Sequence, residues 1–260
     1  MSRQCTVLLH RCKSSHQCKE ILLTKEFLPH ETKQQRKDRK RKEKTSIREQ
    51  YLIVDNTTPA TTDTDVAFVL GNGVSRQSIN PADLAHHGIT YGCNALYREF
   101  SPDYLVAVDT KMIKEITTAG YHKLHSVWTN TNKYSKDIDG LNLFTPSQGW
   151  SSGPSALNLA STHENKTIYI LGFDYAGIGN KNELVNNIYS GSSNYKKVNE
   201  RATYFGNWQN QTTTCINKNT KIKYIRVIES ANSFIPDTLI GILNLTHITV
   251  ENFKKKFQLA

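Results

Sequence analysis

A short apolar run that stops at a glycine turn constrains the fold of this chain more than any other stretch. Residues 66–75 read Val-Ala-Phe-Val-Leu-Gly-Asn-Gly-Val-Ser. A continuous apolar run of this length is typical of a buried parallel strand, and a glycine turn after such a strand brings backbone N–H groups close to a phosphate or nucleotide. Gly-x-Gly without a third glycine also serves ordinary strand-to-helix turns, so the motif indicates a nucleotide site only in combination with others.

The positive charge of the chain is concentrated near its N-terminus. Of the 260 residues, 37% are hydrophobic, which is enough for one core beside an unstructured arm, and the formal net charge is +10. Residues 31–49 hold nine basic and four acidic side chains, and this local excess of five is half of the net charge. Such a run binds nucleic acid or another anionic surface through counterion release, or it is a solvated arm without a partner.

Neither a membrane span nor a disulfide framework is expected. No stretch approaches the ~20 apolar residues of a transmembrane segment, and the N-terminus lacks a hydrophobic signal core, so we expect a soluble, cytoplasmic protein. The five cysteines are odd in number and unevenly placed. Zinc-ligand residue types do gather near the N-terminus, as Cys5, Cys12, Cys18, His10, His16 and His30. Their spacing misses the usual zinc knuckle, so zinc binding and reduced, unliganded side chains are both open interpretations.

The sequence divides into three parts. Residues 1–65 are predicted to be a basic arm that ends in a polar linker at 56–65, residues 66–235 a nucleotide-binding domain, and residues 236–260 a C-terminal extension with a short helix. From Val66 onward, short apolar runs alternate with amphipathic stretches, a pattern that predicts an α/β, Rossmann-like fold with a mostly parallel sheet and helices on both faces. The predicted strands are 66–70, 89–93, 104–108, 126–129, 167–171 and 222–228.

Helix start signals complete this prediction. Asn80 before Pro81 predicts a helix over 81–87, and Thr110 and Ser152 are candidate N-caps of helices that run to 119 and 162. A helix over 182–201 would be interrupted by Gly191 and the two serines after it. The last predicted helix covers 249–259.

Polar residues follow several of the predicted strands. Because ligands of open parallel sheets bind at the carboxyl ends of the strands, these residues are the candidate site: Gly71, Asn72, Gly73, Ser75, Asn94, Asp109, Gly172, Asp174 and Tyr175. Ser152 and Gly153 open a helix whose N–H groups and dipole can hold an anion. Taken singly, each polar residue is also explained as a turn or helix cap.

The chemistry of these side chains favours a nucleotide. The amides of Asn72 and Asn94 offer paired donors and acceptors to a base or ribose. Asp109 and Asp174 are able to hold a ribose hydroxyl, to orient an acceptor, or to bind Mg²⁺ if a diphosphate is present.

Four ordered motifs resemble those of the small bacterial sialyltransferases, which use CMP-sialic acid. They lie at residues 71–75, 92–97, 152–153 and 168–175, where the family has Gly-Asn-Gly-Pro-Ser, Cys-Asn-x-Phe-Tyr, Thr-Ser-Gly and Leu-x-Gly-Ile-Asp-Phe-Tyr. The resemblance covers residues 66–175, less than half of the chain. It implies a cytidine monophosphate held by Asn72, Asn94, Ser152, Gly153 and Asp174.

A second family shares part of this pattern. The archaeal-type 6-hydroxymethylpterin diphosphokinases have a similar glycine turn, and residues 101–109, Ser-Pro-Asp-Tyr-Leu-Val-Ala-Val-Asp, are similar to their Pro-Asp-Tyr-x-Val-x-x-Asp. That resemblance implies Mg²⁺-dependent transfer of pyrophosphate from ATP to a small alcohol.

The chain departs from the sialyltransferases at the general base. Those enzymes use a histidine in a Tyr-x-Gly-His motif, whereas this chain has Tyr204-Phe205-Gly206-Asn207 and no histidine between His163 and His247. An asparagine amide does not accept a proton at this step. The candidate catalytic residues are therefore Asp109, Asp174 and Tyr204, and the tyrosine either assists a phosphate leaving group or packs.

These residues and motifs are compatible with three functions. The leading hypothesis is transfer of a glycosyl group from a CMP-type nucleotide sugar, which requires no cofactor. The second is the Mg²⁺-dependent diphosphokinase reaction. The third is a non-catalytic binding module of phage type, in which the basic residues 31–49 carry the function.

Overall fold

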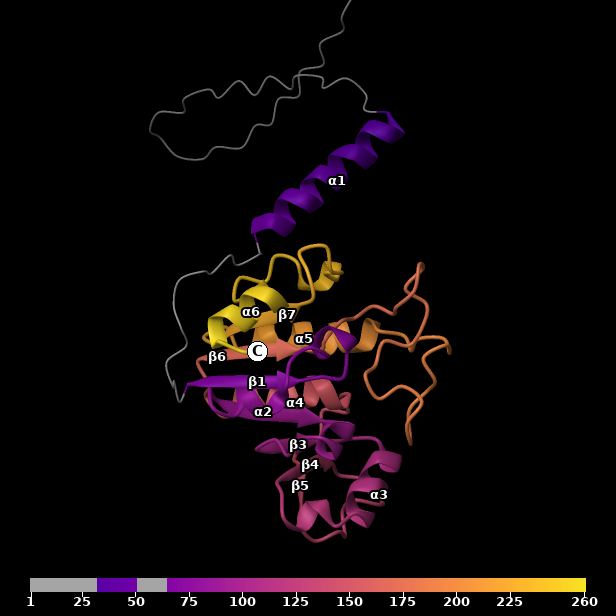
Figure 1. Cartoon of the computed structure of the whole chain (residues 1–260), viewed down its shortest axis with the longest axis vertical. Helices are drawn as coiled ribbons and strands as arrows, with labels where there is room; N and C mark the ends of the chain where they lie inside the picture. The colour runs from indigo at the N-terminus through magenta and orange to yellow at the C-terminus, as the bar shows by residue number, and fades with distance from the viewer. Residues whose placement is uncertain (1–31, 51–64) are drawn as a thin grey trace, which may run out of the picture. The chain divides into compact units, whose positions relative to one another are not determined.

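The computed structural model describes residues 32–50 and 65–260 (Figure 1). The chain divides into two units after residue 41, which lies inside helix α1 (Lys33–Gln50). Helix α1 contains all nine basic side chains of the predicted basic run. The cysteine- and histidine-rich N-terminus and most of the predicted linker lie outside the described residues.

An eight-stranded, entirely parallel sheet forms the centre of the domain that begins at Asp65, which confirms the predicted α/β, Rossmann-like fold. Its spatial order is β5-β4-β3-β2-β1-β6-β7-β8. The strands are β1 (Val66–Leu70), β2 (Ile89–Cys93), β3 (Tyr104–Val106), β4 (Val127–Asn130), β5 (Leu141–Phe144), β6 (Thr167–Leu171), β7 (Lys223–Ile228) and β8 (Leu245–Thr249).

The strand order creates a switch point beside β1. The chain builds β2 to β5 outward on one side of β1, then crosses back to place β6 on its other side, followed by β7 and β8. Strand β1 consequently pairs with β2 and with β6. The connections that follow β1 and β6 therefore run toward opposite edges of the sheet. Ligands of open α/β sheets bind in the crevice that forms at such a point.

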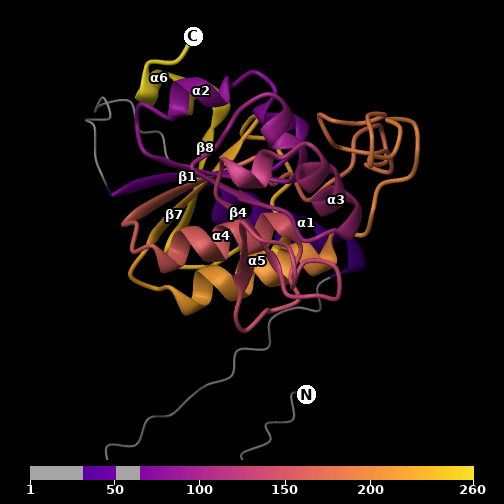
Figure 2. The same cartoon turned by 90° about the horizontal axis from the view of Figure 1, so that it is seen from below.

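Side chains of the central strands alternate between two apolar cores. Phe68 and Leu70 pack in one core, and Ala67 and Val69 pack in the other. Figure 2 shows α2 and α6 on one face of the sheet and α4 and α5 on the other. The helix bounds are α2 (Pro81–Leu84), α3 (Thr110–Thr118), α4 (Ser152–Thr162), α5 (Gly206–Lys218) and α6 (Val250–Phe257), with 3₁₀ turns η1 (Val74–Arg76), η2 (Asn94–Arg98), η3 (Tyr121–Lys123) and η4 (Asp237–Leu239).

Two corrections concern the segment after β6. The predicted helix over 182–201 is absent, and the chain instead forms irregular structure with isolated antiparallel bridges of Leu184 to Ile178 and to Arg201. Gly191 and the two serines after it have low helix propensity, which disfavours a continuous helix through this segment. Helix α5, which follows this segment, is not predicted from the sequence. This long connection lies beyond the arrowheads of β1 and β6 (Figure 1).

The predicted C-terminal extension contributes to the sheet. Residues 236–260 supply the edge strand β8 as well as helix α6, whose Phe253 and Phe257 are buried against Phe68. Within residues 32–50 and 65–260, each helix is too short or too polar to cross a bilayer.

Candidate functional site

A cavity of about 600 Å³ opens at the carboxyl ends of β1, β2, β3 and β6. Most of the predicted site residues line it, namely Gly71, Asn72, Gly73, Asn94, Asp109, Ser152, Gly153 and Asp174. Two predicted residues do not. Ser75 lines a second cavity of about 530 Å³ next to the first, and Tyr204 is 76% exposed outside both.

Four N–H groups of the glycine turn after β1 donate to acceptors within the protein. The N–H groups of Gly71 and Gly73 donate to the carbonyls of Leu171 and Gly172 at 2.8 and 2.9 Å. The next N–H, of Val74, donates to Asn186 Oδ1, and that of Ser75 to Asp174 Oδ2. The N–H groups of these four residues are therefore used in hydrogen bonds within the protein rather than offered to the cavity.

The glycines instead let the turns after β1 and β6 approach each other. A Cβ atom on Gly73 would lie 2.5 Å from Asp174 Oδ2 and 2.7 Å from the carbonyl oxygen of Gly172. Asn72, which lies between the two glycines, also lines the cavity.

Two buried amide oxygens of the cavity wall lack hydrogen-bond partners among the described residues. Asn72 is 8% exposed, and its Nδ2 donates to Tyr195 Oη at 3.2 Å while its Oδ1 has no donor. Asn94, which follows β2 with a φ of 54°, has a buried Oδ1 that is unpartnered as well. Buried polar atoms are nearly always hydrogen-bonded, so two orphaned acceptors in one cavity indicate a site for a donor-bearing ligand.

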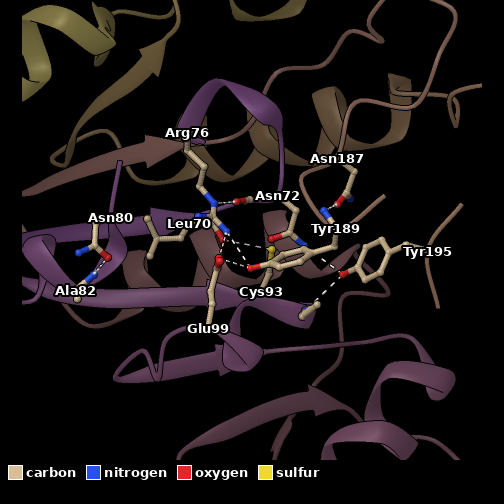
Figure 3. Close-up of polar contacts among 12 residues, drawn as sticks. Leu70, Asn72, Arg76, Asn80, Ala82, Cys93, Glu99, Asn187, Tyr189 and Tyr195 are labelled. Atoms are coloured by element: carbon tan, nitrogen blue, oxygen red, sulfur yellow. Dashed lines mark hydrogen bonds and ion pairs between the residues drawn. The ribbon is translucent and has the colours of Figure 1, made fainter. Parts of the chain in front are cut away.

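Tyr195 joins the two turns that carry these amides (Figure 3). Its Oη accepts from Asn72 Nδ2 and also from the N–H of Ala95, the residue after Asn94, at 3.3 Å. Burial raises the pKa of the Tyr195 phenol above its usual value, so the hydroxyl stays protonated at neutral pH.

Two buried arginines hold the carbonyl groups of the turns. Arg76 is 3% exposed, and its Nε donates to the carbonyl of Gly71 while Nη2 donates to Glu99 and Tyr189 (Figure 3). On the other side of the switch point, Arg226 donates to the carbonyls of Phe173 and Asp174 at 2.8 and 3.1 Å. Each turn is thereby pre-organised by a guanidinium.

The N-terminus of helix α4 faces the same cavity. Ser152 Oγ accepts from the N–H of Val108 at 3.1 Å, so this hydroxyl holds the helix against the segment that follows β3. The N-cap of the helix is Ser151 rather than the predicted Ser152, and the Ser151 side chain makes no capping hydrogen bond. The N–H groups of Ser152 and Gly153 have no intrahelical acceptor by helix geometry, and Pro154 has no N–H to satisfy. Two backbone donors and the positive end of the helix dipole are therefore directed at the cavity.

The two candidate carboxylates differ in their environment. Both oxygens of Asp174 accept hydrogen bonds from Ser75, one from its N–H and one from its hydroxyl. Asp109, rather than the predicted Thr110, is the N-cap of α3; it is exposed, and its carboxylate receives no hydrogen bond from the part of the chain that is described. Asp174 thus fastens the β1 turn, whereas the carboxylate of Asp109 is available for chemistry.

Aromatic side chains that no strand-end motif indicates complete the cavity. Trp150, Phe205 and Trp208 line it, with the rings of Phe205 and Trp208 edge to face at 5.6 Å. They come from the loop before α4 and from the start of α5, so they lie away from the ends of the predicted strands. Across residues 32–50 and 65–260, no cluster of three or more His, Cys, Asp or Glu side chains is placed to hold a metal ion.

Comparisons of the chain with family models, with curated proteins and with solved structures gave no match. The sialyltransferase and diphosphokinase resemblances therefore stay predictions, and a functional assignment has to rest on the geometry of the cavity.

Proposed function

We propose that the domain binds a nucleotide in the cavity at the switch point. The observation that carries this proposal is the pair of buried amide oxygens, Asn72 Oδ1 and Asn94 Oδ1, which lack donors. A buried acceptor left unpaired costs about 1–3 kcal/mol, and a ligand that brings N–H or O–H donors removes that cost. Ribose hydroxyls and the amino group of cytosine are donors of this kind.

Other groups that line the cavity also suit a nucleotide. The N–H groups of Ser152 and Gly153 suit a phosphate, because a helix N-terminus binds anions through its free donors and its dipole. The faces of Trp150, Phe205 and Trp208 suit a base, since stacking on aromatic side chains is worth about 1–3 kcal/mol per base. A cavity of about 600 Å³ is of the size that small-molecule ligands occupy.

We infer that the nucleotide is the leaving group in transfer of a glycosyl unit from a CMP-type nucleotide sugar. The bond between the anomeric carbon and a phosphate oxygen breaks, and its electron pair leaves with the phosphate of CMP. The acceptor oxygen forms the new bond to the anomeric carbon, and its proton passes to the carboxylate of Asp109. This carboxylate takes the place of the missing histidine, because Asn207 is an exposed amide and Asp174 is engaged with Ser75.

One observation also favours the diphosphokinase alternative. Mg²⁺ is commonly held by one or two carboxylates together with phosphate oxygens, and the carboxylate of Asp109 shares the cavity with the helix N-terminus. If this alternative holds, Mg²⁺ strengthens ATP binding and Asp109→Asn removes the gain. The glycosyl-transfer proposal instead expects CMP binding that is independent of Mg²⁺.

Thermal unfolding in the presence of nucleotides tests the proposal. We expect CMP at 100 times its Kd to add about 2.7 kcal/mol to the free energy of unfolding. The variant Asn94→Ala, which removes one of the two acceptors, should lose most of this stabilisation at the same CMP concentration. Asn142→Ala is the matched control, because Asn142 is an exposed asparagine on the edge strand β5, outside the cavity lining.

The outcome separates the three functions. Stabilisation by CMP alone supports the glycosyl-transfer proposal, and stabilisation by ATP only with Mg²⁺ supports the diphosphokinase. No stabilisation by CMP, CDP, UDP, GDP or ATP contradicts both enzymes and leaves the non-catalytic module.

A further inference from the structure

Helix α1 is densely charged and carries no apolar side chain in its first part. Between Lys33 and Lys42 there are seven basic residues and one acid, Asp38. All side chains from Lys33 to Lys42 are exposed. A helix that is polar all round does not bury a face in a protein core, so its composition has to be explained by solvent or by a charged partner.

Most of the basic residues share one side of the helix. At 3.6 residues per turn, five of them fall on an arc of roughly 140°, namely Lys33, Arg36, Lys37, Lys40 and Arg41. Asp38 projects away from this arc, and its carboxylate accepts hydrogen bonds from Gln34 Nε2 at 3.1 and 3.3 Å. We call these five residues the basic face of α1.

We propose that the basic face of α1 binds the phosphate backbone of duplex DNA without sequence preference. Duplex DNA carries one charge per roughly 1.7 Å, so the ~15 Å length of a ten-residue helical stretch meets several phosphates. The major groove of B-DNA is wide enough to admit an α-helix, whereas the major groove of A-form RNA is too narrow.

The composition of the helix disfavours other anionic partners. Helices that lie on membranes insert an apolar face, and residues 33–42 have none. Proteins that bind single strands stack bases on aromatic side chains, and this stretch has no aromatic residue. Duplex DNA requires only the cations that are present.

Fluorescence anisotropy of a short labelled duplex with the full-length chain tests the proposal. With about five phosphate contacts, log Kd should rise with log[salt] at a slope of about 4.5, which weakens binding roughly 500-fold between 50 and 200 mM salt. Replacing the five residues of the basic face by glutamine should weaken binding at least about 100-fold at low salt and flatten the slope. Glutamine has nearly the helix propensity of lysine and arginine, so the helix is retained.

The matched control removes the same charge from the sheet domain. It replaces Lys111, Lys123, Lys133, Lys197 and Lys221, all exposed, by glutamine, and binding should stay within about threefold of wild type. Equal weakening by both sets of substitutions would overturn the proposal, because the attraction would then be a property of net charge. Tighter binding of the wild-type chain to phosphatidylserine vesicles or to single-stranded DNA than to the duplex would also overturn it.

Discussion

Gly172→Ala is expected to destabilise the sheet domain by at least about 3 kcal/mol. Gly172 follows β6 with a φ of 66°, a left-handed conformation that costs an alanine about 1–2 kcal/mol. In addition, its Cβ would lie 2.7 Å from the carbonyl oxygen and 2.9 Å from the carbonyl carbon of Gly71, which are backbone atoms of the neighbouring turn. In a domain of this size, each kcal/mol lowers Tm by about 2–4 °C, so calorimetry should show a fall of roughly 10 °C.

Gly120→Ala is the matched control for this experiment. Gly120 has a φ of 70°, close to that of Gly172, but a Cβ there would meet no atom within 4 Å. This variant should lose only the about 1–2 kcal/mol of the left-handed conformation. Equal losses in the two variants would show that the contact between the β1 and β6 turns is not the reason for glycine at residue 172.

Asp109→Asn is expected to lower turnover of the proposed glycosyl transfer by about 100-fold or more, the usual contribution of a general base. The reason is that an amide of the same shape cannot take the acceptor proton. Release of CMP from CMP-sialic acid is the measurement, with water or an added sugar as acceptor. Affinity for CMP should change little, because the proposed nucleotide contacts come from Asn72, Asn94 and the start of α4.

The control for the carboxylate is Asp139→Asn, since Asp139 is exposed and lies outside the cavity lining. It should retain wild-type turnover. If Asp109→Asn released CMP as fast as the wild-type chain does, another group would be the base and the proposed mechanism would be wrong.

The central strands and one helix could be predicted from sequence because burial leaves a strong local pattern. Residues 66–70, 89–93 and 167–171 are short apolar runs that form β1, β2 and β6 with the predicted bounds, and the helix over 152–162 forms α4. Since parallel strands end at the same edge, the polar residues that follow them also had to gather there. Eight of the ten residues predicted to bind or catalyse line one cavity, six of them because they follow strands of the sheet and two, Ser152 and Gly153, because helix α4 begins at the same edge.

Edge strands and α5 could not be predicted in the same way. Strand β5 is only half-buried and β8 contains two threonines and a histidine, so neither is a continuous apolar run. Helix α5 is rich in asparagine and threonine, which have low helix propensity, and it forms because Cys215 and Ile216 pack into the core.

The tertiary partners of the site left no local signal. Tyr195 lies more than a hundred residues from Asn72, and Arg226 lies 52 residues from Asp174, so each is an ordinary loop or strand residue in the sequence. The hydrogen-bond acceptors of the N–H groups in the glycine turn could not be predicted either, because these acceptors belong to β6 and to the loop after it. The sequence therefore predicted which residues of the β1 turn line the cavity, but not the hydrogen bonds within the protein that the N–H groups of Gly71, Gly73 and Val74 make.

The most direct test of a nucleotide site at the switch point is to titrate the ¹⁵N-labelled protein with CMP and follow its amide resonances. We expect saturable shifts that are largest for the backbone N–H groups of Ser152 and Gly153 and for the side-chain amides of Asn72 and Asn94. Resonances of the exposed Leu243, outside the cavity lining, should not move. Saturable shifts confined to residues outside the cavity, or no saturable shift with CMP, CDP, UDP or GDP, would contradict it.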